Sequence, residues 1–342
     1  MNFKGIPSRT PFRLSEMVDT VEYIRITDSI KVGLVEDIKY CNGRFYLLDK
    51  TNKSIWILDD KGHFLADINR QGRANEEYLS LYAFDVNPSN NEVSIYDQTG
   101  NKVLVFDSFG NLLRQYTINN DNIEEFYSDF SVLPDGRYLC YNPDFFSDSC
   151  RRGLWLDDSR LNYSKNLVTI NPEFILSSPT SGAPKYFSRM SNGDIGIMGG
   201  EDNNNIFHIS PTGEITIAYH ISTDAQLPLS LTKMSDAPIP VLKSAKFYHK
   251  YYYAETDHWI FIVALNGDKF LRIFYDKRRH IGHQVRTSDD SIDDVNLGDI
   301  LRASDGKLLS VFEPDELKDK GIELWQDIRS DSNPTIAVAY MK

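Results

Sequence analysis

Residues 45–68 read FYLLDKTNKSIWILDDKGHFLADI and residues 93–118 read VSIYDQTGNKVLVFDSFGNLLRQYTI, so one pattern occurs twice, 48 residues apart. In each copy an aspartate, Asp49 or Asp97, ends one apolar run, and a second aspartate and a glycine follow the next run. A repeat of 40–50 residues is typical of one blade of a β-propeller. The spacing therefore predicts the architecture before any other feature is considered.

The apolar runs of the repeat have the composition of β-strands. They are short, rich in β-branched and aromatic residues, and separated by polar turn residues, as in residues 45–48 and 55–58. Gly62 and Gly110 stand where a hairpin needs a residue that adopts a positive φ. Each copy is therefore predicted to be a meander of about four antiparallel strands.

Weaker copies continue along the chain, for example where residues 130–136 and 187–193 read FSVLPDG and FSRMSNG. We predict an all-β fold, a six-bladed β-propeller of four-stranded antiparallel blades that forms one domain over residues 1–342. The approximate blades are residues 35–68, 84–118, 128–170, 186–221, 245–285 and 296–342. An additional strand at residues 21–26 is expected to pair with the last blade near residues 336–340, because an unpaired edge would leave backbone groups unsatisfied.

Composition and charge agree with one large globular β domain. Hydrophobic residues make up 41% of the chain, which is enough to fill a core at this length. The formal net charge of −12 opposes binding to nucleic acid or to an anionic membrane surface. No run of 18 or more apolar residues occurs, so no transmembrane helix is predicted.

The sequence leaves the cellular compartment open. The first residues have no hydrophobic stretch of the kind found in signal peptides, which by itself predicts a cytoplasmic protein. The same start is expected of a chain from which such a peptide has been removed. Cys140 and Cys150 either form a bridge across a loop or remain two separate thiols, and the second interpretation is favoured; with Cys41 they do not decide the compartment.

Residues 43–86 resemble the opening blade of a bacterial family of six-bladed β-propellers related to NHL-repeat and TolB-like propellers. In that family a loop of the type Gly-Arg-Gly-Pro-Gly-Glu-Tyr leads into the next blade. Here Gly72, Arg73, a glutamate and Tyr78 match that loop, whereas the central Gly-Pro-Gly is absent. The resemblance implies an envelope protein, secreted or lipid-anchored, and it implies no particular reaction.

Acidic residues recur where the predicted blades begin. In a propeller the first strands of the blades surround a central channel, where loops from every blade converge. The candidates for a site at the channel mouth are Asp37, Asp85, Asp129 and Asp299. Such a group would suit Ca²⁺ or another divalent cation with oxygen ligands. In the alternative interpretation these carboxylates hydrate the channel and cap strand ends.

Histidines provide a second, weaker candidate. His280 and His283 have an H-x-x-H spacing beside Asp289, Asp290 and two further aspartates, which is compatible with a metal site but is also common in surface loops. The chain has no nucleophile elbow, phosphate-binding loop, dinucleotide fingerprint or zinc-protease motif. We also find no counterpart of the Glu-Asn-Asp set of metal-dependent lactonase propellers. No catalytic residue is therefore assigned.

Two functions remain open at this point. The favoured one is a non-catalytic recognition scaffold, in which loops at one rim or at the channel mouth bind a protein or a glycan. The alternative is a lactonase-like hydrolase or lyase with a divalent cation in the channel that acts as a Lewis acid. The fifth and sixth blades and residues 279–299 depart furthest from the repeat, so a specific site is expected there or at the channel mouth.

Overall fold

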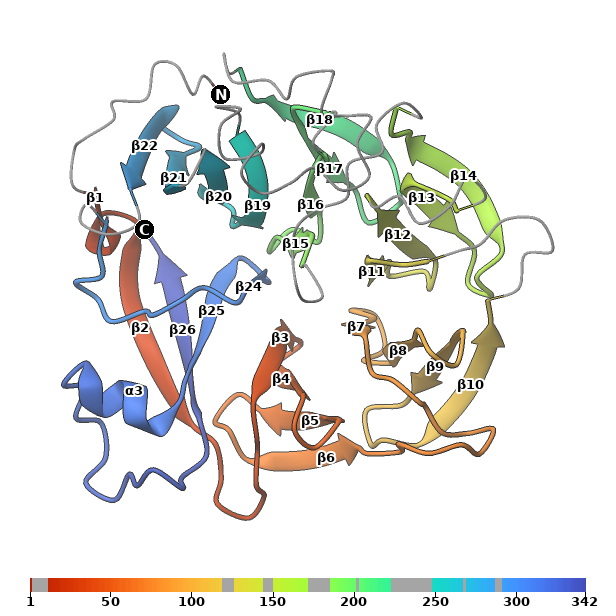
Figure 1. Cartoon of the computed structure of the whole chain (residues 1–342), viewed down its shortest axis with the longest axis horizontal. Helices are drawn as coiled ribbons and strands as arrows, with labels where there is room; N and C mark the ends of the chain where they lie inside the picture. The colour runs from red at the N-terminus through yellow and green to blue at the C-terminus, as the bar shows by residue number, and fades with distance from the viewer. Residues whose placement is uncertain are drawn as a thin grey trace. The chain divides into compact units, whose positions relative to one another are not determined.

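The computed structural model consists of six four-stranded antiparallel sheets, the blades of a β-propeller (Figure 1). The described residues are 1, 12–118, 126–143, 150–171, 185–200, 203–222, 248–266, 269–286 and 291–342. Residues 144–149, 201–202, 245–247 and 267–268 of the predicted blades lie outside this part of the chain. No helix in the described ranges is long and apolar enough to cross a membrane.

The chain divides into two compact units, which are described separately. One unit comprises Leu14–Thr117 and Asp293–Lys342 and contains the first, second and sixth blades. The first blade is β3 (Val35–Cys41), β4 (Arg44–Asp49), β5 (Ser54–Asp59) and β6 (Phe64–Ile68). The second blade is β7 (Ala83–Val86), β8 (Val93–Asp97), β9 (Lys102–Phe106) and β10 (Leu112–Thr117). The sixth blade is β24 (Arg302–Ser304), β25 (Lys307–Phe312), β26 (Thr335–Met341) and β2 (Val18–Arg25). Two short helices accompany these sheets, the 3₁₀-helix η2 (Leu14–Glu16) and the α-helix α3 (Pro314–Asp319).

The other unit comprises Met1–Arg13 and Ile118–Ile292 and contains the third, fourth and fifth blades. The third blade is β11 (Asp129–Val132), β12 (Tyr138–Asn142), β13 (Gly153–Asp157) and β14 (Tyr163–Val168). The fourth blade is β15 (Phe187–Arg189), β16 (Ile195–Met198), β17 (Asn205–Ile209) and β18 (Ile215–His220). The fifth blade is β19 (Tyr248–Glu255), β20 (Trp259–Asn266), β21 (Lys269–Asp276) and β22 (Ile281–Arg286). A short parallel pair joins β1 (Phe12–Arg13) to β23 (Ser291–Ile292).

The predicted fold class is confirmed, and so is the pairing of the N-terminal strand with the last blade. Strand β2 runs antiparallel to β26, with Val21 opposite Ala339 and Ile24 opposite Ile336. The sixth blade is therefore assembled from both ends of the sequence. Because β2 is its fourth strand, β26 does not present an unpaired edge.

The repeated aspartates Asp49 and Asp97 explain why the pattern recurs. Each is fully buried at the end of the second strand of its blade. Asp49 accepts a hydrogen bond of 2.7 Å from the backbone N–H of Gly33, and Asp97 accepts bonds of 2.9 and 2.8 Å from those of Leu79 and Ser80. In both blades the carboxylate thus holds the segment that leads into the first strand.

The repeated glycines have an equally specific role. Gly62 and Gly110 adopt φ values of 83° and 81° in the hairpin between the third and fourth strands. A Cβ atom at Gly62 would lie 2.2 Å from the carbonyl oxygen of Arg25, and one at Gly110 would lie 2.2 Å from that of Asp67. Each hairpin therefore packs against backbone of the preceding blade so closely that only glycine fits.

The hydrophobic cores lie between adjacent sheets of each unit. Ile57 of the first blade and Ile95 of the second belong to one core, and Leu47 of the first blade and Val338 of the sixth belong to another. The largest of the fully buried side chains are aromatic, and Trp155 is completely inaccessible. This agrees with the packing role expected of large rings in the wedge between blades.

The sixth blade carries an insertion that the other described blades of its unit lack. Residues 313–334 connect its second and third strands, whereas residues 50–53 and 98–101 make that connection in the first and second blades. The insertion begins with α3, whose start is fixed by a capping box between Glu313 and Glu316. It packs onto the sheet through Leu317, which is buried against Phe312 and Ala337.

The strand pairing in the sixth blade leads to a test with two isoleucines. Ile24 is 6% exposed in β2, whereas Ile217 is 62% exposed in β18. We expect Ile24→Ala to lower the free energy of unfolding by about 2–4 kcal/mol, because it leaves a cavity where the ends of the chain meet. Ile217→Ala should change the free energy by less than about 0.5 kcal/mol. Urea denaturation of both variants measures this, and equal losses would contradict a specific role for the β2–β26 pair.

Candidate functional site

The first strands of the first, second and sixth blades are joined by buried ion pairs. Arg302 of β24 holds Asp37 of β3 through two contacts, Nε to Oδ1 at 3.0 Å and Nη2 to Oδ2 at 2.5 Å. Lys39, two residues further along β3, contacts Asp85 of β7 at 2.9 Å. All four side chains are less than one-tenth exposed. Each carboxylate thus has a cation beside it, as a buried charge requires.

Two of the predicted cation ligands, Asp37 and Asp85, take part in these ion pairs. Asp37 and Asp85 contact different cations, and each belongs to a link between two blades. Asp129 lies in the other unit, where it accepts hydrogen bonds from the backbone N–H groups of Tyr186 and Phe130. Asp299 is exposed in the segment before β24. In the described part of the chain no three His, Cys, Asp or Glu residues are grouped so as to hold a metal ion. A cation site at these residues stays a prediction.

The two predicted histidines occupy different surroundings. His280 is in the exposed turn between β21 and β22, with a φ of 57°, and its Nδ1 lies 3.2 Å from the hydroxyl of Tyr275. The ring of His283, in β22, packs against Phe12 at a centroid distance of 4.7 Å. Asp289 and Asp290, which the H-x-x-H interpretation included, lie outside the described residues.

The two neighbouring cysteines are separate thiols. Sγ of Cys140 contacts Oδ2 of Asp157 at 3.5 Å, and Sγ of Cys150 accepts a hydrogen bond of 3.4 Å from the side-chain amide of Asn142. Both side chains are buried. The favoured interpretation of the sequence, two separate thiols without a disulfide between them, is therefore confirmed.

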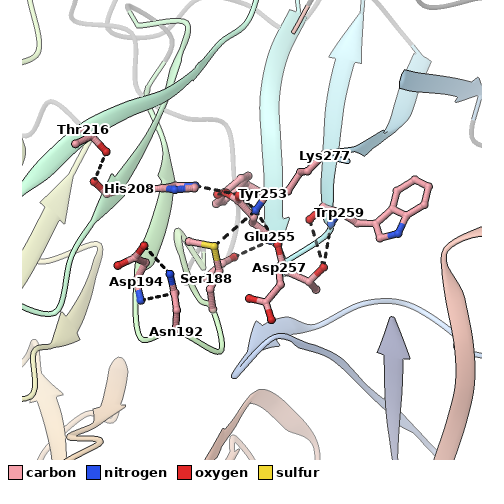
Figure 2. A network of polar contacts seen from close by, with 12 residues as sticks. Ser188, Asn192, Asp194, His208, Thr216, Tyr253, Glu255, Asp257, Trp259 and Lys277 are labelled. Atoms are coloured by element: carbon pink, nitrogen blue, oxygen red, sulfur yellow. Dashed lines mark hydrogen bonds and ion pairs between the residues drawn. The ribbon is translucent and has the colours of Figure 1, made fainter. Parts of the chain in front are cut away.

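The densest group of polar contacts in Figure 2 surrounds Glu255 at the end of β19. This glutamate is completely buried. Its Oε1 lies 2.6 Å from Nζ of Lys277 and 2.9 Å from Nε2 of His208, while its Oε2 accepts a hydrogen bond from the hydroxyl of Tyr253. Its backbone N–H donates to Oγ of Ser188 at 3.1 Å. We call Glu255, Lys277, His208 and Tyr253 the Glu255 cluster.

The Glu255 cluster joins the fourth and fifth blades. His208 comes from β17 and Ser188 from β15 of the fourth blade, whereas Glu255 and Tyr253 are in β19 of the fifth. The backbone at Gly196 of the fourth blade approaches so closely that a Cβ atom there would lie 2.3 Å from the hydroxyl of Tyr253. The geometry is that of a closed internal contact between two sheets.

The electrostatics of the cluster favour an ionised carboxylate. Burial acts to raise the pKa of Glu255, but the hydrogen bond from His208 and the positive charge of Lys277 outweigh it, so the pKa lies below its ordinary value. Burial, and next the charge of Glu255, raise the pKa of Tyr253 well above its ordinary value. Tyr253 thus stays a protonated donor at neutral pH. Glu255 has no exposed surface, and its contacts with His208 and Ser188 join the fifth blade to the fourth.

Neither the ion pairs nor the Glu255 cluster was identified from the sequence. The sequence pattern gave Glu255 no role. The position of Glu255 directly after the aromatic and apolar residues 251–254 was a usable signal, because a buried carboxylate there must find hydrogen-bond partners. Its partners come from distant strands, so the sequence did not indicate them.

A cavity in the unit that contains the sixth blade lies at the insertion. It has a volume of about 610 Å³, and its lining residues come from two segments, 25–31 and 326–333. We call it the insertion pocket. Asn333, which is 9% exposed, fixes one wall against the other: its Oδ1 accepts from the backbone N–H of Val32 at 2.9 Å, and its Nδ2 donates to the carbonyls of Thr27 and Ile30.

Three cations and three carboxylates line the insertion pocket: Arg25, Lys31, Arg329, Asp28, Asp327 and Asp331. Arg25 contacts Asp28 at 2.9 Å and Asp327 at 2.8 Å. The Arg25 side chain is 32% exposed, and its two partners are about two-thirds exposed. The pocket therefore presents paired charges to the solvent, unlike the buried pairs of the inner strands.

Comparisons with known proteins place the chain in a family and a fold. The family model described as "Domain of unknown function (DUF4934)" matches residues 3–340. A protein from Bacteroides fragilis NCTC 9343 named "Putative exported protein" is similar in structure, with a TM-score of 0.79, 17% sequence identity, and coverage of 98% of this chain and 99% of that chain. A member of the DUF4221 family from Bacteroides vulgatus is similar with a TM-score of 0.55, 9% identity, and coverage of 95% and 97%. At these identities the likeness shows the fold alone. No curated protein matches the chain.

The pair of Asp37 and Arg302 can be tested by a double-variant cycle. We expect Arg302→Met to lower the free energy of unfolding by about 3–5 kcal/mol, because it leaves the carboxylate of Asp37 buried without its guanidinium. Asp37→Leu combined with Arg302→Met should recover most of the loss, because no charge is then left alone. Urea denaturation with and without Ca²⁺ measures both. Wild-type stability of Arg302→Met, or a dependence on Ca²⁺ that the double variant abolishes, would contradict a structural role for the pair.

The Glu255 cluster predicts a dependence of stability on pH. Since the folded-state pKa of Glu255 is lowered, its contribution is present above the ordinary value of 4.5 and is lost as the pH falls through the folded-state pKa. We expect Glu255→Gln to lower the free energy of unfolding by about 2 kcal/mol at pH 7. The difference from wild type should shrink as the pH falls below 4.5. Urea denaturation between pH 3 and pH 8 measures this, with Glu214→Gln in an exposed turn as the control. A difference that stays constant with pH would contradict the prediction.

Proposed function

The chain belongs to the DUF4934 family, and we propose that it is a non-catalytic binding scaffold that takes a protein or glycan ligand at the insertion pocket. The observation that carries the proposal is the insertion itself. Residues 313–334 are ordered onto a blade that is complete without them, and ordering a chain segment costs conformational entropy. Long connections of this kind in compact domains are usually functional.

The buried carboxylates are already paired inside the protein, and this supports a binding scaffold in preference to an enzyme. Asp37 and Asp85 are each held by a cation from a strand of another blade, and Glu255 is enclosed by its own cluster. A general acid or base must reach the substrate directly or through one water. These three carboxylates are less than one-tenth exposed. The contacts of Asp37 and Asp85 join blades of the unit that also contains the pocket.

The proposal also covers the cellular location of the protein and its relationship to other propeller families. We place the protein in the cell envelope or outside the cell. This is supported by the resemblance of residues 43–86 to propellers of envelope proteins, and by the name of the structural neighbour from Bacteroides fragilis. The net charge of −12 favours a partner that is neither nucleic acid nor an anionic membrane. A relationship to NHL-repeat and TolB-like propellers remains part of the proposal as well.

Binding without turnover is the testable core of this proposal. We expect a thermal-shift screen of glycans and peptides to find a ligand that binds with one-to-one stoichiometry in calorimetry. Mass spectrometry should recover that ligand unchanged after a day with the protein. Conversion of the ligand would contradict the proposal. So would a melting temperature that Ca²⁺, Mg²⁺ or Zn²⁺ raises in the wild type but not in Asp129→Asn or Asp299→Asn, since that result would favour the metal-dependent hydrolase.

A further inference from the structure

The insertion pocket has the size of a small-molecule site. Its volume of about 610 Å³ falls within the range of about 300–1,000 Å³ that is usual for ligand pockets. Both walls belong to one compact unit, and Asn333 joins them by three hydrogen bonds. The site is thus held in shape by the protein itself, which reduces the entropy that a ligand must lose on binding.

The charges of the pocket are balanced within its walls. Arg25 is shared between Asp28 and Asp327, Nε of Arg329 lies 3.0 Å from Oδ1 of Asp331, and the ammonium of Lys31 donates to the backbone carbonyl of Asp331. A ligand with a net negative charge would compete with these carboxylates for the guanidinium groups. A cationic ligand would compete in the same way for the carboxylates. The pairing therefore disfavours a strongly charged ligand of either sign.

The remaining lining groups suit a ligand that is polar but neutral. Gln326 and Ser332 each offer both a donor and an acceptor, and Ile30 and Ile328 supply apolar surface. A hydroxyl group can accept a hydrogen bond from a guanidinium and donate one to the adjacent carboxylate at the same time. A ligand rich in hydroxyl groups can therefore bridge the ion pairs without separating them.

We propose that the insertion pocket binds a neutral carbohydrate of a few sugar units. This inference rests on the proposed binding function and names the class of its ligand. Recognition arises from hydroxyl groups that bridge the guanidinium of Arg25 or Arg329 and a neighbouring carboxylate. The apolar side chains of Ile30 and Ile328 contact the C–H surfaces of the sugar.

The first test compares glycan classes. Purified protein is applied to an array that holds neutral oligosaccharides, uronate-containing and sulfated glycans, and glycans with free amino groups. We expect retention of neutral oligosaccharides in preference to both charged classes. Calorimetry of the best neutral oligosaccharide should give a Kd that changes less than about twofold between 50 and 500 mM NaCl, because no net ion pair forms. Preference for acidic glycans with a steep salt dependence would overturn the inference, and so would an array with no retained glycan.

The second test places the ligand in the pocket. Gln326→Ala removes an exposed amide, and Arg329→Ala with Asp331→Ala removes an ion pair without changing the net charge. Each should weaken binding of the same oligosaccharide at least tenfold. The matched control is Lys318→Ala with Asp315→Ala, which removes an exposed ion pair from α3, in the same insertion but away from the pocket lining. It should keep Kd within twofold, and urea denaturation should give all variants the stability of the wild type.

The outcomes separate this inference from the proposed function. Carbohydrate binding that the pocket variants leave unchanged would overturn the pocket assignment but would leave a binding scaffold in place. A peptide or protein ligand that only the pocket variants lose would overturn the carbohydrate class alone. Cleavage of an oligosaccharide whose binding depends on Gln326 would support the assignment of the pocket and overturn the non-catalytic function.

Discussion

A carboxylate that leaves water must be given hydrogen bonds or an opposite charge, and this constraint fixes the parts of the structure to one another. Asp49 and Asp97 are satisfied by backbone N–H groups of the segments that enter their blades. Asp37 is satisfied by Arg302 of another blade, and Glu255 by His208 of another blade. Shape alone would let neighbouring sheets slide, because apolar contacts are not directional. The buried carboxylates define the register between blades within each unit.

The same constraint accounts for the limits of the site prediction. Acidic residues at successive blade openings suggested a set of cation ligands, since the sequence shows their spacing and not their partners. The cation that accompanies Asp37 lies 265 residues away, at Arg302, and Lys39 reaches across to Asp85 in the next blade. A lysine or arginine in a predicted inner strand is therefore as informative as the aspartate beside it. Reading both signs together would have favoured ion pairs at these positions.

The fold was predictable for the opposite reason, because its decisive contacts are local or periodic. The turn carboxylates Asp59 and Asp107 accept hydrogen bonds from residues two and four positions ahead, so their pattern is visible in the sequence. Gly62 and Gly110 mark hairpins that press on the preceding blade, and they recur at the same spacing. The pairing of β2 with β26 followed from the need to satisfy a strand edge. Residues 313–334 obey no such period, so their pocket was not predictable beyond the irregularity of the sixth blade.

The position of the insertion pocket can be explained by where charged side chains are available to a ligand. In the first, second and sixth blades the buried charges of the first strands, Asp37, Lys39, Asp85 and Arg302, are taken up by contacts between sheets, so they have little capacity left for a ligand. The insertion lies outside this framework, and its charges are exposed. Arg25 links the two regions: it belongs to β2, whose pairing completes the sixth blade, and its guanidinium enters the pocket. A ligand that contacts Arg25 therefore binds directly to the strand that joins the two ends of the sequence, and its binding should stabilise that pairing by mass action.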